Sequence, residues 1–251
     1  MNIKMVVTDL DGTFLREDKT VSERMLNAFA QLREKGIKTV YATGRGESSI
    51  KLTSLLQFDG SVRNNGAIAY IQDKLIYERL LPADSIRDLL VTCDKEGIDI
   101  VAECGDMFYA TFNIDEKYSW QVENEIVDFS KHNIDAEKLF AVVDSPEVLD
   151  IIKQNIKEDQ YIYASRDDYA LIMHKDATKS KGVASLAEYW NIDKSEIVAF
   201  GDDSNDTDML EYCGIGIAMG NAIDEVKAVA DQICDTNDND GIAKWVEENL
   251  L

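Results

Sequence analysis

The sequence predicts an α/β fold, in which a parallel sheet with helices on both faces is interrupted by an inserted α+β domain. Short apolar runs alternate with helical patterns at both ends of the chain, which is typical of βα units. This alternation is lost between Pro82 and Thr178. Polar segments directly follow three of the apolar runs, where ligands bind in such sheets. We therefore expect a core domain at 1–81 and 179–251, and an inserted domain at 82–178.

The first apolar run begins at Met5 and predicts a buried parallel strand that ends in two carboxylates, Asp9 and Asp11. Gly12 indicates that the chain turns there, so that Asp9 points into a cleft while Asp11 acts from a second direction. Taken alone, the same residues are also a common turn and helix N-cap signal. Their partners further along the chain must decide between the two interpretations.

A helix follows at 23–36, with Ser22 as its N-cap and Gly36 as its stop signal. The next strand, at 37–42, ends in Thr43, Gly44 and Arg45, and a helix containing Leu52, Leu55 and Leu56 comes after it. Gly44 and Gly46 suggest a dinucleotide fingerprint, but its third glycine is missing, so we expect no such cofactor. Two short strands between Val62 and Leu81 predict a hairpin.

The inserted segment shows strands and helices without regular alternation. Its only histidines, His132 and His174, have no metal-ligand spacing, so we expect structural or surface roles for both. The expected elements are helices at 85–97 and 146–157 and strands at 98–103, 107–112, 139–143, 160–164 and 169–173.

Alternation returns in the last part of the chain. A strand at 196–200 runs directly into the acidic segment Gly201–Asp206. The remaining expected elements are helices at 181–190, 207–213, 222–230 and 241–250 and strands at 214–218 and 232–234.

Composition limits the class of protein. The net charge of −22 argues against nucleic acid or an anionic membrane as the main partner. Four widely spaced cysteines form no C-x-x-C pair, so we expect no zinc or redox site. The sequence shows neither a secretion signal nor an apolar run of the ~20 residues that span a membrane. These features predict a soluble, cytoplasmic protein.

Candidate site residues follow three of the predicted strands. The strand ends carry Asp9 and Asp11, then Thr43, then Asp202, Asp203 and Asp206, and Lys179 precedes the last strand. If Asp9, Asp202 and Asp206 share one cleft, the site carries about three uncompensated negative charges, which implies a divalent cation. Oxygen ligands alone, in a partial carboxylate cage that leaves room for water and a phosphate oxygen, suit Mg²⁺ better than Zn²⁺ or Ca²⁺. With the cation and hydroxyl of Lys179 and Thr43 added, the site predicts phosphoryl transfer.

These segments resemble the motifs of the haloacid dehalogenase (HAD) superfamily of phosphohydrolases. The resemblance spans the core and implies a Rossmann-like parallel-sheet domain with an inserted C2-type (IIB) α+β cap, as in the Cof-type branch. The matching motifs are Asp9-Leu10-Asp11-Gly12-Thr13, Thr43-Gly44-Arg45, Lys179, Gly201-Asp202 with Asn205-Asp206, and the Cof-like segments Asn65-Gly66-Ala67, Ala218-Met219-Gly220-Asn221-Ala222 and Asp240-Gly241. The pair Lys181-Gly182 is an alternative match for the lysine motif, but the distance from Lys179 to Asp202 fits better.

The resemblance also implies roles for individual residues. Asp9 would be the nucleophile that forms an aspartyl phosphate, and Asp11 would be the acid and base. Asp9, Asp202 and the main-chain carbonyl of Asp11 would bind Mg²⁺. The phosphate-binding residues would be Thr43, Gly44, Lys179 and Asn205, with Arg45 and Asp206 in support and Asp203 a solvated turn residue.

The implied function is a Mg²⁺-dependent phosphatase of small phosphorylated metabolites, such as sugar phosphates or phosphorylated cofactors. A phosphotransferase or mutase using the same aspartyl phosphate is an alternative. A phospho-accepting signalling domain is another, but Asp11 argues against it, since a signalling phosphate must persist. The sequence does not name the substrate, because no motif guides the assignment of residues in the cap.

Overall fold

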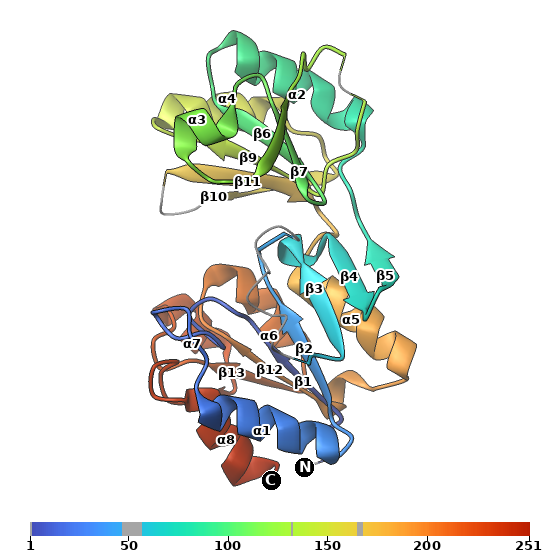
Figure 1. Cartoon of the computed structure of the whole chain (residues 1–251), viewed down its shortest axis with the longest axis vertical. Helices are drawn as coiled ribbons and strands as arrows, with labels where there is room; N and C mark the ends of the chain where they lie inside the picture. The colour runs from blue at the N-terminus through green and yellow to red at the C-terminus, as the bar shows by residue number, and fades with distance from the viewer. Residues whose placement is uncertain (1, 47–56, 132, 165–167) are drawn as a thin grey trace. The chain divides into compact units, whose positions relative to one another are not determined.

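The structure is a computed structural model that describes residues 2–46, 57–131, 133–164 and 168–251 (Figure 1). The chain divides into two compact units. The first holds the chain up to Arg45, the segment that ends at Glu78, and Thr178–Leu251; the second holds Arg79–Ala177. The helix predicted around Leu52, Leu55 and Leu56 lies outside the described residues, as does His132.

The first unit is built on an eight-stranded sheet in the order β14-β13-β12-β1-β2-β3-β4-β5. Strands β14 to β3 run parallel, while β4 and β5 pair antiparallel beside β3, which confirms the predicted hairpin. The strands are β1 (Met5–Thr8), β2 (Lys38–Ala42), β3 (Gly60–Arg63), β4 (Ile68–Ile71), β5 (Lys74–Glu78), β12 (Ile197–Gly201), β13 (Ile215–Ala218) and β14 (Gln232–Ile233).

Strands β1 and β12 lie side by side in the middle of this sheet. Every residue of both is buried, as expected for central parallel strands whose faces are both covered. Their register places Thr8 opposite Phe200, so the residues that follow each strand emerge next to each other. The two acidic segments therefore meet at the same sheet edge.

Helices cover the sheet in two pairs, α1 with α8 and α5 with α6 (Figure 1). The Ser22 hydroxyl accepts a hydrogen bond from Met25 N and caps α1, as predicted. The core helices are α1 (Glu23–Glu34), α5 (Lys179–Trp190), α6 (Thr207–Tyr212), α7 (Asp224–Val229) and α8 (Gly241–Asn249). Short 3-10 helices lie at η3 (Asn64–Gly66), η4 (Lys194–Glu196) and η5 (Ser204–Asp206).

Helix α5 begins two residues earlier than the hydrophobic pattern predicts. Thr178 is its N-cap and accepts a hydrogen bond from Lys181 N, so Lys179 is the first helical residue. The backbone of Gly66 passes so close to this cap that an added Cβ atom would lie 1.9 Å from Thr178 O. Gly66 also has a φ of +103°, so both space and conformation require glycine there. This contact fixes the position of Thr178, and therefore the residue at which α5 begins.

The second unit contains a six-stranded sheet in the order β10-β11-β9-β6-β7-β8. All neighbours are antiparallel except the pair β7 and β8. The strands are β6 (Ile100–Cys104), β7 (Met107–Ala110), β8 (Glu123–Ile126), β9 (Lys138–Val142), β10 (Gln160–Ala164) and β11 (Tyr169–His174). Strand β8 was not predicted, because its exposed, acidic residues lack an apolar pattern.

Helices α2 (Ala83–Lys95) and α4 (Pro146–Asn155) pack against each other and against one apolar cluster of this sheet. The short helix α3 (Ile114–Tyr118) contributes Ile114 to a separate cluster that contains Phe140. His174 Nδ1 accepts a hydrogen bond from Asp176 N, in agreement with the structural role expected of it. Within the described part of the chain, no helix has both the length and the apolar character needed to cross a membrane.

Candidate active site

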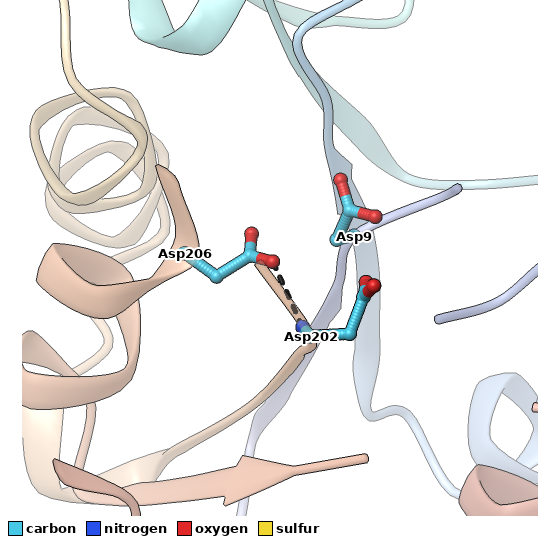
Figure 2. A group of neighbouring side chains, drawn as sticks. All are labelled: Asp9, Asp202 and Asp206. Atoms are coloured by element: carbon cyan, nitrogen blue, oxygen red, sulfur yellow. Dashed lines mark hydrogen bonds between the residues drawn. The ribbon is translucent and has the colours of Figure 1, made fainter. Parts of the chain in front are cut away.

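Asp9 and Asp202 emerge from the carboxyl ends of the neighbouring strands β1 and β12. The backbone N–H of Asp9 donates to Phe200 O at 3.0 Å, which continues the parallel ladder into the site. One carboxylate oxygen from each of Asp9, Asp202 and Asp206 lies within 4.8 Å of the others (Figure 2). The structure thus brings Asp9 together with two carboxylates that lie almost 200 positions later in the sequence.

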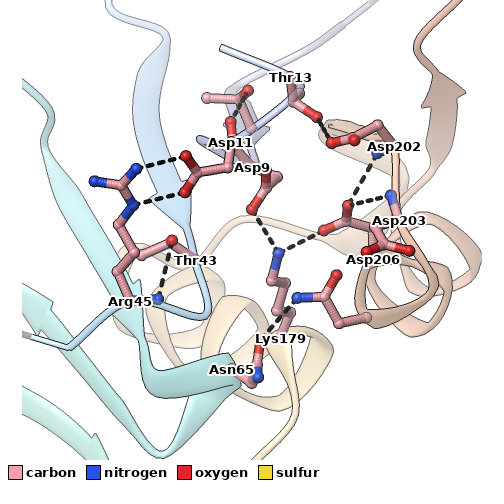
Figure 3. A network of polar contacts seen from close by, with 12 residues as sticks. Asp9, Asp11, Thr13, Thr43, Arg45, Asn65, Lys179, Asp202, Asp203 and Asp206 are labelled. Carbon is pink, nitrogen blue, oxygen red and sulfur yellow. Dashed lines mark hydrogen bonds and ion pairs between the residues drawn. The ribbon is translucent and has the colours of Figure 1, made fainter. Parts of the chain in front are cut away.

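A buried lysine compensates part of this charge. Lys179 Nζ donates to Asp9 Oδ1 at 2.7 Å and to Asp206 Oδ1 at 2.6 Å (Figure 3). The side chains of Lys179 and Asp206 are fully buried. The expectation of three uncompensated charges was therefore wrong, because it assigned Lys179 to phosphate alone and omitted its ion pairs with the cluster.

Asp206 holds the loop that follows β12. Its second oxygen, Oδ2, accepts hydrogen bonds from the backbone N–H groups of Asp202 at 2.9 Å and Asp203 at 3.1 Å. Asp203 in turn accepts a hydrogen bond from Ser204 N and caps η5, so it is a turn residue, as expected. Both oxygens of Asp206 are occupied, so this residue is suited to positioning Lys179 and Asp202.

The buried ion pairs change the titration of the cluster. Burial raises the pKa of Asp9 well above its usual range; the Lys179 ammonium opposes this, and Asp206 and Asp202 add to it. Burial acts to lower the pKa of Lys179, but the carboxylates of Asp206 and Asp9 outweigh it, and the pKa lies above its usual value. Lys179 is therefore a permanent cation beside a carboxylate that needs more positive charge to ionise.

Asp202 is fixed by the loop that follows Asp9. Thr13 Oγ1 donates to Asp202 Oδ1 at 2.5 Å, and an added Cβ atom on Gly12 would lie 2.3 Å from Asp202 Oδ2. Gly12 has a φ of +79°, which only glycine adopts freely. Burial raises the pKa of Asp202 to about 7, despite the hydrogen bond from Thr13.

The carboxylate oxygens that remain show which residues could bind a divalent metal ion. Among the described residues, no hydrogen-bond donor contacts Asp9 Oδ2 or Asp202 Oδ2. Hard oxygen donors of this kind suit Mg²⁺ or Ca²⁺. Two buried carboxylates with raised pKa values also need a cation to ionise fully. Asp9 and Asp202 therefore each have an oxygen free for a metal ion, whereas both oxygens of Asp206, the third carboxylate of the group, already accept hydrogen bonds.

The Asp11 carboxylate binds two cationic side chains outside this cluster. Arg45 binds the carboxylate through two hydrogen bonds, Nε to Oδ2 at 2.6 Å and Nη2 to Oδ1 at 2.5 Å (Figure 3). Lys19 Nζ lies 2.9 Å from Oδ1. Burial acts to raise the pKa of Asp11, but the hydrogen bonds from Arg45 and Lys19 outweigh it and hold the pKa below its usual value. Asp11 is thus an anion in this arrangement.

Thr43 and Asn205 are linked through Asn65. Asn65 N donates to Thr43 O at 2.9 Å, and Asn205 Nδ2 donates to Asn65 Oδ1 at 2.9 Å. An added Cβ atom on Gly44 would lie 3.0 Å from the same Asn65 oxygen. The Thr43 hydroxyl accepts a hydrogen bond from Arg45 N at 3.2 Å and can still donate. These residues form a second, uncharged side of the site.

Sequence reasoning named most of these residues but missed three of their contacts. It assigned no function to Thr13 or Asn65, and it did not predict that Arg45 binds the carboxylate of Asp11. Thr13 and Asn65 both lie inside the motifs that carry the family resemblance, and that position was the only available signal. No periodicity predicts a contact between side chains at different strand ends.

Comparison with known proteins agrees with this geometry. A family model described as haloacid dehalogenase-like hydrolase matches residues 6–246. A phosphatase of the haloalkanoate (HAD) superfamily from Bacteroides thetaiotaomicron has a similar structure, with a TM-score of 0.86 and 27% identity over 98% of this chain and 94% of that one. The HAD subclass IIB sugar phosphatase BT4131 gives a TM-score of 0.84 and 26% identity over 98% of both chains.

A curated relative is also a phosphatase. The 5-amino-6-(5-phospho-D-ribitylamino)uracil phosphatase of Bacillus subtilis is 28% identical over 260 residues, which cover 97% of this chain and 96% of the relative. The fold, the strand-end carboxylates and the family match are consistent with one another. The chain therefore belongs to the haloacid dehalogenase-like hydrolases, in the Cof-type branch of phosphohydrolases, and is an enzyme of the phosphomonoesterase class.

Proposed function

We propose that this protein is a Mg²⁺-dependent phosphatase that hydrolyses small phosphorylated metabolites through an aspartyl phosphate on Asp9. The observation that supports this most strongly is the buried cluster in which Lys179 contacts Asp9 and Asp206 while Asp202 lies within 4.8 Å. Such a site combines a nucleophilic carboxylate, a fixed cation and carboxylate oxygens that can bind a metal ion.

Asp9 and Asp202 would hold Mg²⁺, together with the main-chain carbonyl of Asp11. The bound ion would supply positive charge between the Asp9 carboxylate and the phosphoryl oxygens. One oxygen of Asp9 would contact the ion and the other would attack phosphorus; Oδ1 accepts a hydrogen bond from Lys179 Nζ, and Oδ2 accepts none from the described residues. Lys179, Thr43, Gly44 and Asn205 would hold the transferred group.

Asp11 would carry the proton in both steps. As an anion held by Arg45, it is ready to accept a proton from the water that hydrolyses the aspartyl phosphate. Donation to the leaving oxygen in the first step requires Asp11 to be protonated, so the Arg45 guanidinium must then release it. Arg45 would in this way set the protonation state of Asp11 through the cycle.

The second unit, Arg79–Ala177, would act as the cap that selects the leaving group. The relatives named above act on a sugar phosphate and on a phosphorylated ribitylaminouracil. We infer from them that the substrate belongs to the sugar phosphates or the phosphorylated cofactor precursors.

The function can be tested by measuring phosphate release from a panel of such esters, with Mg²⁺ and with EDTA. We expect Mg²⁺-dependent release and a phosphoprotein that forms on acid quenching and is cleaved by hydroxylamine. Asp9→Asn should abolish both while the protein stays folded, and the exposed Asp73→Asn should change neither. Turnover by pure Asp9→Asn would contradict the proposal, and transfer of phosphate to a second hydroxyl would indicate a phosphotransferase instead.

A further inference from the structure

We infer that Asn221 and Asn237 form an amide relay that positions the loop between Asp9 and Asp202, and that this relay is needed for turnover. The inference rests on the phosphatase function proposed above. Asn221 lies in the turn before α7, and Asn237 lies in the loop between β14 and α8. The hydrogen bonds of both side chains go to residues other than Asp9, Asp11 and Asp202, so both would be positioning residues.

Three hydrogen bonds in series make the relay. Asn237 Nδ2 donates to Leu15 O at 2.9 Å, Asn237 N donates to Asn221 Oδ1 at 3.0 Å, and Asn221 Nδ2 donates to Gly12 O at 2.7 Å. The partners at each point are backbone groups, which are either obligate donors or obligate acceptors. These backbone groups therefore fix the orientation of both side-chain amides. The relay binds the loop at two points, the carbonyls of Gly12 and Leu15.

The loop that follows Asp9 is least constrained at Gly12, the residue whose carbonyl accepts the hydrogen bond from Asn221. Gly12 combines a positive φ with freedom to adopt other conformations, so the peptide that follows it can rotate at little cost. Asp202 packs against one side of Gly12, and Asn221 binds its carbonyl. Asp11 and Thr13 flank this glycine, so its conformation decides where both side chains point.

The relay also connects this loop to the one that carries Asp202. Ile223 N donates to Asp202 O at 3.0 Å, so the turn that contains Asn221 is bonded to the end of β12 as well as to Gly12. The other end of the relay is anchored by further contacts. Asp238 accepts from Glu17 N at 3.0 Å, and Asp240 accepts from Arg16 Nη2 at 2.9 Å.

The two asparagines differ in burial, which makes them informative to mutate. Asn237 is 6% exposed, whereas Asn221 is exposed. Replacement by aspartate keeps the shape and the acceptor oxygen but removes the N–H donor and places a carboxylate against a carbonyl. Asn221→Asp breaks only the bond to Gly12, and Asn237→Asp breaks only the bond to Leu15. Asn239→Asp, in the same loop but exposed, with a side chain whose hydrogen bond is to Asp235, is the matched control.

The test measures kcat and KM on p-nitrophenyl phosphate with Mg²⁺, together with amide hydrogen exchange in the metal-free proteins. We expect Asn221→Asp and Asn237→Asp each to lower kcat about 10- to 100-fold, with KM within about twofold, and Asn239→Asp to match the wild type. Exchange at Phe14 and Leu15, whose amides donate to Asp9 O and Leu10 O, should be faster in both relay variants.

The double variant tests whether the two residues act as one unit. If they form a relay, Asn221→Asp with Asn237→Asp should lose little more activity than the worse single variant. Full additivity, or unchanged kcat and exchange in folded single variants, would overturn the inference. If the wild type releases no phosphate, the proposed function fails, and the exchange measurement alone decides whether the relay holds the loop.

Discussion

Arg45 Nε and Nη2 hold the two oxygens of Asp11 at 2.6 and 2.5 Å, in the paired geometry that arginine makes with carboxylates. Lys19 adds a third, weaker contact from an exposed position. This pair sets the charge of the residue that we assign to proton transfer. Asp9, the proposed nucleophile, has a raised pKa and Asp11 a lowered one, so the pKa values of two aspartates two positions apart are shifted in opposite directions.

The first prediction concerns this pair. Replacing Arg45 with glutamine removes the hydrogen bonds and the charge that lower the pKa of Asp11, so this pKa should rise. The limb of the pH profile of kcat that reports Asp11 should therefore move to higher pH. Arg24→Gln, which removes a surface pair with Glu247, is the control. If this limb of the pH profile lies at the same pH in Arg45→Gln and in the wild type, another group transfers the proton.

The second prediction separates Lys179 from Lys181. Lys179→Met leaves Asp9 and Asp206 buried without their cation, so it should abolish turnover and lower the free energy of unfolding by about 3–5 kcal/mol. Lys181 is exposed on the same turn of α5, and Lys181→Met should alter neither property. Urea unfolding and phosphate release measure both effects. Loss of activity in Lys181→Met alone would reverse the assignment.

The third prediction concerns metal and stability. If Mg²⁺ binds the native cluster and not the unfolded chain, as proposed, it should raise the melting temperature with concentration, in line with about 2.7 kcal/mol at a hundredfold excess over Kd. Ca²⁺ should also stabilise the protein but support little turnover, because its larger coordination shell misplaces the reacting groups. Thermal melts in EDTA, Mg²⁺ and Ca²⁺ measure this. An Asp202→Ala variant that responds like the wild type would remove Asp202 from the metal site.

The fourth prediction is the pH dependence of the metal-free protein. Burial raises the pKa of Asp202 from 3.8 to about 7, so the native state binds more protons than the unfolded state between these values. The free energy of unfolding should then fall as the pH rises from about 4 to about 7, and the raised pKa of Asp9 acts in the same direction.

Urea titrations in EDTA across this range measure the slope. Asp202→Asn cannot titrate at this position, so its slope should be smaller than that of the wild type. Saturating Mg²⁺ should oppose the fall, since the ion displaces the protons that stabilise the empty cluster. An equal slope in Asp202→Asn would show that Asp202 ionises normally in the folded protein.

The sequence by itself determined the fold class and most of the candidate site. The apolar run from Met5 and the run before Gly201 predict central parallel strands, because only strands covered on both faces are apolar throughout. The carboxyl ends of such strands share one edge of the sheet. The proximity of Asp9 to Asp202 was therefore predictable from the sequence alone.

The contacts within the site were decided by the tertiary structure. The ion pairs of Lys179 with Asp9 and Asp206, the pairing of Arg45 with Asp11 and the relay through Asn221 each join residues from different segments of the chain. Sequence spacing carries no information on such contacts, because strand register and loop geometry place the side chains within hydrogen-bond distance. The charge of the cluster depends on those distances, so the sequence predicts the residues of the site and the tertiary structure decides their protonation.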